Sequence, residues 1–113
     1  MRKTDKKIDN QLRTALTDVC ETALQEIDGF QWLTHLVDYA NFPKSLTVVC
    51  IFASNEKLEV FLSKNDKNEL TSLIQSKLDG IGIKVKNVAK HISYDSEENC
   101  EKQHNGNWAN RLR

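Results

Sequence analysis

The stretch TDKKIDNQLRTALTDVCETALQEID, residues 4–28, carries the clearest pattern in the sequence. Its apolar residues recur at steps of three and four, which is the spacing of one face of an amphipathic α-helix: Ile8, Leu12, Ala15, Leu16, Val19, Cys20, Ala23, Leu24 and Ile27. Thr4 can cap the start of this helix, and Gly29 follows its end as a C′ glycine would. The pattern therefore predicts one long helix over residues 4–28.

The length of this helix matters for assembly. A helix of roughly 24 residues is about 36 Å long, whereas a compact chain of this size has a radius of gyration of only about 13 Å. The apolar stripe is then hard to cover at both ends. We expect either that the basic first turns project or that a second copy covers them, so a homodimer through helix 4–28 is one candidate assembly.

Two strands are expected next. Residues 30–39 are rich in aromatic and β-branched side chains, which favours a strand, although helical spacing also fits part of the segment. Residues 41–45, with Pro43, have turn chemistry. Residues 46–53 form a continuous apolar run, which is typical of a buried central strand.

Two helices and a third strand complete the predicted order α-β-β-α-α-β. Ser54 can cap a short helix, and Asp66 with Glu69 resembles a capping box ahead of a second helix that ends at Gly80. Alternating apolar residues then predict a strand that starts at Ile81, slips near residue 87 and continues toward residue 94. A short helix through 96–103 is compatible with the polar end. We predict an α+β fold with the helices on one face of a small sheet.

Composition narrows the classes of protein. The 113 residues fit a single domain, 1–113, in which 95–113 forms a polar C-terminal extension. Sixteen basic residues balance sixteen acidic ones, so no global field attracts nucleic acid. The longest apolar run is far shorter than the ~20 residues of a membrane span, and the N-terminus does not resemble a secretory signal. Three widely spaced cysteines favour a reducing cytoplasm.

Catalytic and metal sites are not evident. The three histidines, His35, His91 and His104, are scattered, and no nucleophile lies in an elbow motif such as G-x-S-x-G. Cys100 and His104 are spaced i, i+4 and could supply part of a zinc site, but the remaining ligands of a zinc motif are missing. We therefore expect no enzyme activity, no metal and no cofactor; an enzyme or metal protein built on these residues, with the histidines in one pocket, is the third-ranked alternative.

Local charge gives a candidate binding surface. Three lysines would lie on one side of the third strand, and with the basic N-terminus and the C-terminal tail they could contact phosphates and stack one aromatic ring. The candidate nucleic-acid-binding residues are Arg2, Lys3, Lys6, Lys7, Lys84, Lys86, Lys90, Trp108, Arg111 and Arg113. The competing interpretation is an edge strand that lysines protect from aggregation.

The predicted element order resembles that of type II KH-like domains, such as ribosome-binding factor A. The resemblance implies contact with a nucleic acid backbone through a glycine-bearing turn between the paired helices. The corresponding turn here, residues 63–68, contains no glycine, so the resemblance is one of topology.

Three stretches, 29–35, 41–46 and 93–108, are similar to a small uncharacterised bacterial family whose members are sometimes labelled Fis-type transcriptional regulators. That label implies a C-terminal helix-turn-helix, which this sequence does not show, so no DNA-binding residue is carried over. Together these observations favour a non-enzymatic binding or regulatory module with nucleic acid as a candidate partner. The alternative is a protein-interaction or homodimerisation domain.

Overall fold

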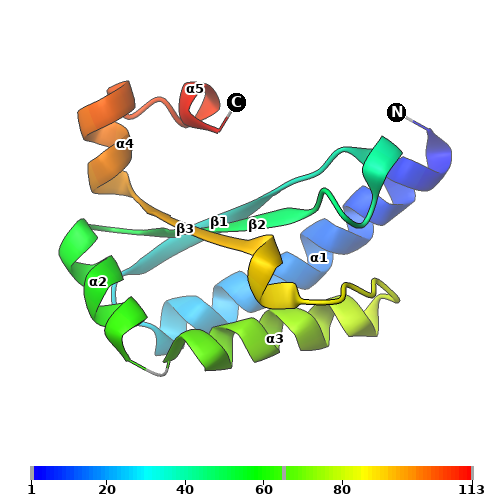
Figure 1. Cartoon of the computed structure of the whole chain (residues 1–113), viewed down its shortest axis with the longest axis horizontal. Helices are drawn as coiled ribbons and strands as arrows, with labels where there is room; N and C mark the ends of the chain where they lie inside the picture. Colours follow the sequence, from blue (N-terminus) through cyan, green and yellow to red (C-terminus); the bar gives the residue numbers. More distant parts are fainter. Residues whose placement is uncertain (1, 65, 113) are drawn as a thin grey trace.

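A computed structural model describes residues 2–64 and 66–112 (Figure 1). It confirms the predicted α+β fold, in which a long N-terminal helix, a β-hairpin, further helices and a third strand follow one another. The elements are α1 (Lys3–Glu26), β1 (Phe30–Leu36), the 3-10 turn η1 (Tyr39–Asn41), β2 (Thr47–Phe52), α2 (Asn55–Ser63), α3 (Asp66–Gly80), the 3-10 turn η2 (Val88–His91), β3 (Ile92–Ser96), α4 (Glu97–His104) and α5 (Trp108–Arg111).

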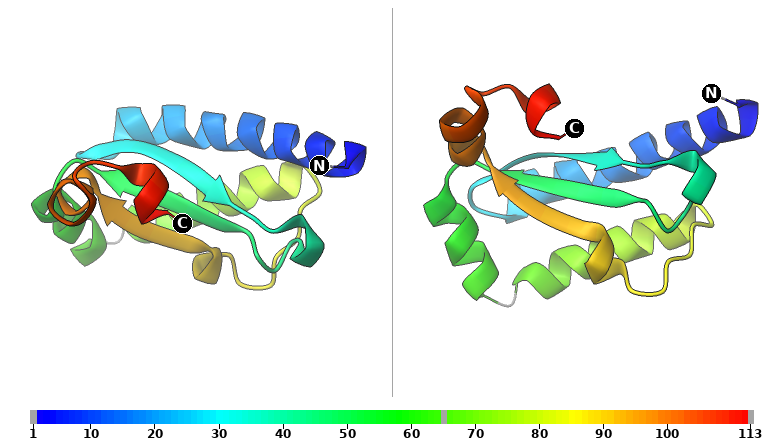
Figure 2. Two further views of the ribbon diagram at one scale, coloured as in Figure 1. Left: turned by 90° about the horizontal axis from the view of Figure 1, so that it is seen from above. Right: turned by 45° about the horizontal axis from the view of Figure 1, so that its top comes forward.

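The three strands form one mixed sheet in the order β1-β2-β3. β1 and β2 pair antiparallel, with Thr34 opposite Val49, whereas β2 and β3 pair parallel, with Cys50 opposite Tyr94. The parallel pair needs a crossover connection, which α2 and α3 supply. Helices α1 and α3 cover one face of the sheet, and α4 and α5 lie toward the other face (Figures 1 and 2).

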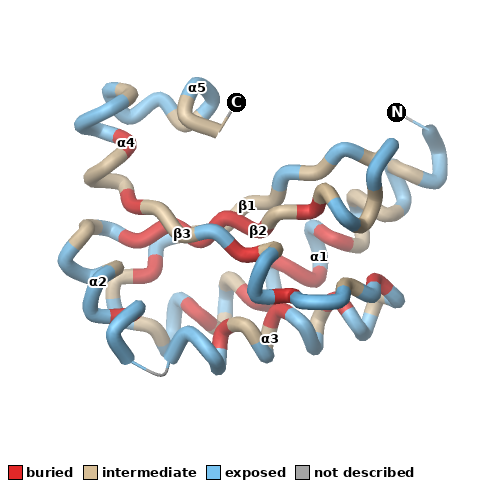
Figure 3. The backbone as a smooth tube through the Cα atoms, in the orientation of Figure 1, coloured by how far each residue is buried: buried red, intermediate tan, exposed pale blue. Residues whose placement is uncertain are grey.

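The core lies between the sheet and the pair α1–α3 (Figure 3). The central strand β2 is buried from Val48 to Phe52, as the apolar run predicted. The apolar stripe of α1 is buried within the chain over most of its length, while the first turns of α1 are exposed. The buried helical residues that face this core are Leu12, Leu16, Val19, Ala23, Leu70, Ile74 and Leu78.

The predicted start of the third strand is wrong. The main-chain N–H groups of Ile81 and Ile83 donate to the oxygen of Leu78, and that of Gly82 donates to Asp79. These amides complete the end of α3, so they cannot join a strand ladder. The side chain of Ile83 is buried in the core, and its alternation with polar residues reflects this packing. β3 begins only at residue 92.

The predicted lysine face of the third strand is wrong for the same reason. Lys84 and Lys86 lie in the irregular segment before β3, and Lys90 lies in η2. The competing interpretation, a lysine-protected edge strand, fails with it. Lys84 and Lys86 instead follow the turn at the end of α3, in which Gly82 adopts a positive φ of 80°.

The helix ends agree with the sequence in part. Ser54 caps α2 by accepting a hydrogen bond from the N–H of Lys57, as predicted. Thr4, by contrast, lies inside α1, because Arg2 holds the cap position, and Asp66 is already the first residue of α3. The short helix expected over 96–103 is present as α4. Among the described residues, no helix is both long enough and apolar enough to cross a membrane.

Candidate functional site

The three histidines lie in three separate places. Each contacts a partner of its own: the Asp9 carboxylate lies 3.0 Å from Nε2 of His35, the main-chain oxygen of Leu46 lies 2.7 Å from Nδ1 of His91, and Nη1 of Arg111 lies 3.2 Å from Nδ1 of His104. A shared histidine pocket is therefore not what the fold builds.

The Asp9 carboxylate joins α1 to the end of the hairpin. It accepts a hydrogen bond from the Tyr39 hydroxyl at 2.8 Å and forms an ion pair with Arg13 at 2.9 Å. It also contacts His35. The hydrogen bonds from His35 and Tyr39 lower the pKa of Asp9. Burial and the bond to Asp9 raise the pKa of Tyr39 to about 12. This cluster is a structural link, and sequence reasoning had placed only His35 of it among the candidates.

The candidate metal residues do not form a site with other ligands. Cys100 is buried in α4, where burial raises the pKa of its thiol, and His104 is occupied by Arg111. Over residues 2–64 and 66–112, no three side chains of His, Cys, Asp or Glu gather in a way that would hold a metal ion.

The segment 97–112, which we call the C-terminal arm, docks on the sheet face opposite α1 and α3. Glu97 accepts hydrogen bonds from two indoles, with Nε1 of Trp32 at 2.6 Å and Nε1 of Trp108 at 3.0 Å. Arg111 forms a bidentate ion pair with Asp95, in which Nη2 lies 2.9 Å from Oδ1 and Nε contacts Oδ2. These contacts tie α5 to β1 and β3.

A second set of hydrogen bonds holds the start of α4 against α2. The fully buried hydroxyl of Ser96 donates to the side-chain oxygen of Asn55 at 2.6 Å and accepts from the N–H of Asn99 at 3.0 Å. Glu98 accepts from the main-chain N–H of Asn55 at 2.9 Å. The predicted polar extension 95–113 thus begins inside β3 and continues as a docked arm.

The arm separates two of the candidate nucleic-acid residues from the rest. Trp108 donates its indole N–H to Glu97, and Arg111 pairs with Asp95. These donors are therefore engaged within the protein. Arg113 lies outside the described residues. Sequence reasoning missed the acceptors Glu97 and Asp95 and the second indole, Trp32, because no local pattern pairs them.

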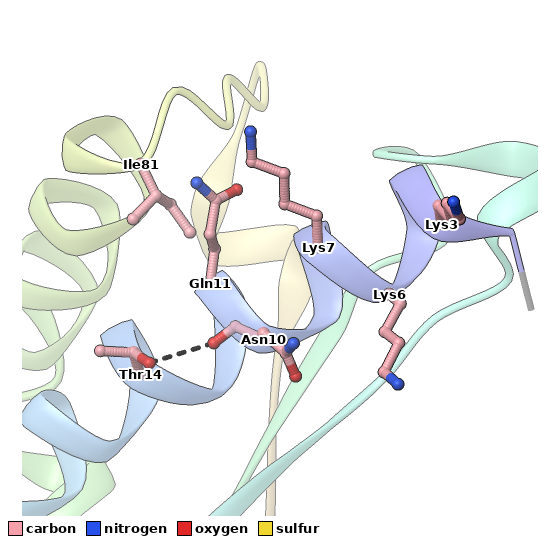
Figure 4. A pocket seen from close by; sticks show the side chains of 7 residues that line it. All are labelled: Lys3, Lys6, Lys7, Asn10, Gln11, Thr14 and Ile81. Carbon is pink, nitrogen blue, oxygen red and sulfur yellow. Dashed lines mark hydrogen bonds between the residues drawn. The ribbon is translucent and has the colours of Figure 1, made fainter.

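Most of the remaining candidates lie toward one end of the molecule, whereas η2, which carries Lys90, lies nearer its middle (Figure 1), and Lys90 lines neither of the depressions at that end. A depression of about 510 Å³ is lined there by Lys3, Lys6 and Lys7 of α1 and by Ile81 after α3. Figure 4 shows Lys7 pointing toward the side of Ile81 and Lys6 pointing away from it. Lys44, which sequence reasoning missed, lines a second depression of about 290 Å³ together with Lys84, Lys86 and His91.

We call the set at this end the basic end; it consists of Arg2, Lys3, Lys6, Lys7, Lys44, Lys84 and Lys86, without Lys90. All seven are exposed, and they come from the N-cap and first turns of α1, from the loop after η1, and from the loop after α3 (Figure 2). Among the described residues, only Lys84 of this set forms an ion pair, with Asp79 at 3.2 Å. The α2–α3 turn differs, because Asp66 and Glu69 place two acids in the first turn of α3, where a phosphate would otherwise be favoured.

Comparison with models of known families, with curated proteins and with solved structures finds no match for this chain.

Proposed function

We propose that this protein is a non-enzymatic binding module whose basic end contacts the phosphates of a nucleic acid. The supporting observation is the gathering of exposed lysines from separate segments at one end of a chain that is neutral overall. Local positive charge of this kind draws phosphate by releasing counterions. The proposal is non-enzymatic because the histidines lie apart, each with its own partner.

The basic end replaces the surface expected from sequence. Lys84 and Lys86 remain in it, now on a loop, and Lys44 joins them. Trp108 and Arg111 leave it, because Glu97 and Asp95 hold them in the C-terminal arm. The proposed contact therefore rests on charge, without a stacking aromatic ring, and predicts little sequence preference.

The test is binding of labelled single-stranded RNA and of labelled duplex DNA, followed by fluorescence anisotropy between about 50 and 200 mM salt. Reversing two charges, Lys7→Glu with Lys86→Glu, should weaken binding at least about tenfold and reduce the salt slope by about two. The matched control is Lys64→Glu with Lys67→Glu, which makes the same charge change at the α2–α3 turn and should leave the affinity nearly unchanged.

Two results would contradict this proposal. Wild-type protein that binds neither nucleic acid, or binds with no salt dependence, removes the phosphate contact altogether. Loss of binding in the Lys64/Lys67 control, with retention in the Lys7/Lys86 variant, moves the contact to the α2–α3 turn.

A second candidate function is a protein-interaction or homodimerisation domain that uses α1. The observation that favours it is exposed apolar surface, since Leu24 on α1 is 52% exposed. Sedimentation equilibrium of wild type and of Leu24→Ser tests this candidate. A dimer that Leu24→Ser weakens supports it, and a monomer at all concentrations counts against self-association through α1.

A further inference from the structure

A groove runs between α1 and β1. It encloses about 420 Å³, and its lining includes the apolar residues Leu16, Cys20 and Leu33 together with Arg13 and Glu21 of α1. Arg13 is mostly exposed and already pairs with Asp9, while Glu21 is exposed and forms no ion pair with any described residue. The groove is separate from the basic end and from the docked arm.

The strand that borders this groove has an open edge. Among the described residues β1 pairs only with β2, so the alternate main-chain groups on its other side meet no strand of that part of the chain. Apart from the ladder with β2, no hydrogen bond within the described chain engages the main chain of residues 31–36. The sequence FQWLTHL contains no Lys, Pro, Asp or Glu, which commonly protect an edge, and its register irregularity lies between Phe30 and Trp32, before the residues that line the groove.

Helix α1 lies where it would support one more strand. Seen from above, α1 runs alongside β1 and beyond its edge (Figure 2, left). A strand added to β1 at the usual spacing of about 4.8 Å would rest above α1. Antiparallel pairing between the β1 strands of two copies is disfavoured, because it would place both α1 helices on the same face of the joined sheet, where each already extends beyond the edge of its own β1 (Figure 2).

We propose that this groove binds an extended segment of another protein, which adds to β1 as a fourth strand. Main-chain hydrogen bonds to the open edge supply affinity, and the side chains that face α1 supply specificity. This inference does not depend on the nucleic-acid contact proposed above, since it uses a different surface.

The charged residues that line the groove indicate which charges the bound segment should carry, and in which order. Arg13 and Glu21 are two turns apart on α1, about 12 Å, which matches residues i and i+4 of a strand, about 13 Å apart on one face. Arg13 lies at the His35 end of β1, because both residues contact Asp9. An antiparallel segment then presents an acidic residue first, an apolar residue level with Leu16 and Thr17, and a basic residue opposite Glu21.

The probe is a synthetic peptide with the core Asp-Thr-Val-Thr-Lys, titrated into the full chain and followed by the NMR signals and hydrogen exchange of backbone amides. We expect saturable shifts at Leu33, Thr34 and His35, and slowed exchange at those of their amides that face the open edge. A peptide N-methylated at both threonines and at the valine should lose this binding, because at least one of the blocked amides then faces β1 and cannot complete the main-chain ladder. The peptide Lys-Thr-Val-Thr-Asp should bind about three- to tenfold more weakly, as expected for two exposed charge pairs.

Matched variants of the protein check the charges. The double swap Arg13→Glu with Glu21→Arg should reverse the preference between the two peptides, and Glu59→Arg, on the exposed side of α2, should leave it unchanged. Circular dichroism verifies that each variant folds. Absence of saturable shifts at β1 up to about 1 mM peptide, the binding limit of interest, would overturn the inference. So would undiminished binding of the N-methylated peptide, or a wild-type dimer that titration with the peptide dissociates, because a second copy would then fill the groove.

Discussion

The indole rings of Trp32 on β1 and Trp108 on α5 meet edge to face, with their centroids 5.1 Å apart and their planes at 87°. Both rings donate to the carboxylate of Glu97. Ile51 stands between Trp32 and Asp95 in the sheet register and is fully buried, although its side chain points away from the main core. The C-terminal arm thus closes part of the second sheet face.

Replacing Trp108 with alanine should release α5 from the sheet. The change removes the ring contact and one hydrogen bond to Glu97, so the free energy of unfolding should fall by about 2 kcal/mol. Urea denaturation followed by far-UV circular dichroism measures this loss. Trp108→Phe keeps a ring without the donor and should lose about half as much. A Trp108→Ala variant within about 0.5 kcal/mol of wild type would contradict the docking role of this ring.

The Asp95–Arg111 pair should make stability depend on acid. Burial alone would raise the pKa of Asp95, but the bonds from Arg111 and from the N–H of Ser96 outweigh it and leave the pKa below its ordinary value of 3.8. A lowered pKa in the folded state stabilises the fold above pH 3.8, and this contribution is lost as pH falls through the folded value.

Removing the cation tests this pair. In Arg111→Met the loss of stability with acid should become shallower, because Asp95 no longer gains from ionisation in the folded state. Thermal denaturation at a series of pH values below about 5 gives the slope. Lys86→Met, which removes a lysine that forms no ion pair within residues 2–64 and 66–112, is the control and should keep the wild-type slope. The lowered pKa values of Asp9, Asp28 and Glu98 maintain part of the slope in both variants.

The tyrosines should resist ionisation in the folded protein. The sequence contains two, and burial raises the pKa of both Tyr39 and Tyr94 to about 12, with the bond to Asp9 adding to the effect at Tyr39. Because the unfolded chain loses these protons near pH 10, stability should fall as pH rises from about 10 to 12. Tyrosinate absorbance measures the titration, with the protein in urea as reference. If half of the tyrosinate absorbance change appears near pH 10 in the folded protein, the pKa of one of the two tyrosines is not raised.

One thiol should react in the native state. Cys20 is partly exposed, whereas Cys50 and Cys100 are fully buried, and burial raises the pKa of Cys50 to about 12. Since the thiolate is the reactive form, a thiol-specific disulfide reagent near pH 8 should show one fast equivalent, and the other two only in urea. Cys20→Ser should abolish the fast phase. Two fast equivalents in wild type would mean that a buried thiol opens to solvent.

The parts of the fold that the sequence predicts are those with a local period. The stripe from Ile8 to Ile27 predicts α1, and the unbroken run that contains Val48 and Phe52 predicts β2. The third strand was misplaced because Ile81, Ile83 and Val85 alternate like a strand while packing against the core from an irregular segment. Alternation cannot distinguish these two situations without knowing which amides the end of α3 has already bonded.

The candidate site was less predictable, because it brings together residues that are far apart in the sequence. The basic residues of α1 were found from composition, but Lys44 joins them only through the tertiary path of the hairpin. The partners of Trp108 and Arg111 were missed for a related reason. Glu97 lies 65 residues from Trp32, and no sequence period relates residues on different elements of the sheet and the arm.

Because Trp32 and Trp108 share the acceptor Glu97, the tryptophan fluorescence of this protein is sensitive to one region of the fold during unfolding. Trp32 and Trp108 are its only tryptophans, so nearly all of its indole fluorescence comes from one spot outside the α1–α3 core. A fluorescence transition therefore follows the detachment of the arm, whereas circular dichroism follows the helices. If the two transitions separate in denaturant, the arm unfolds as a unit of its own while the rest of the domain remains folded.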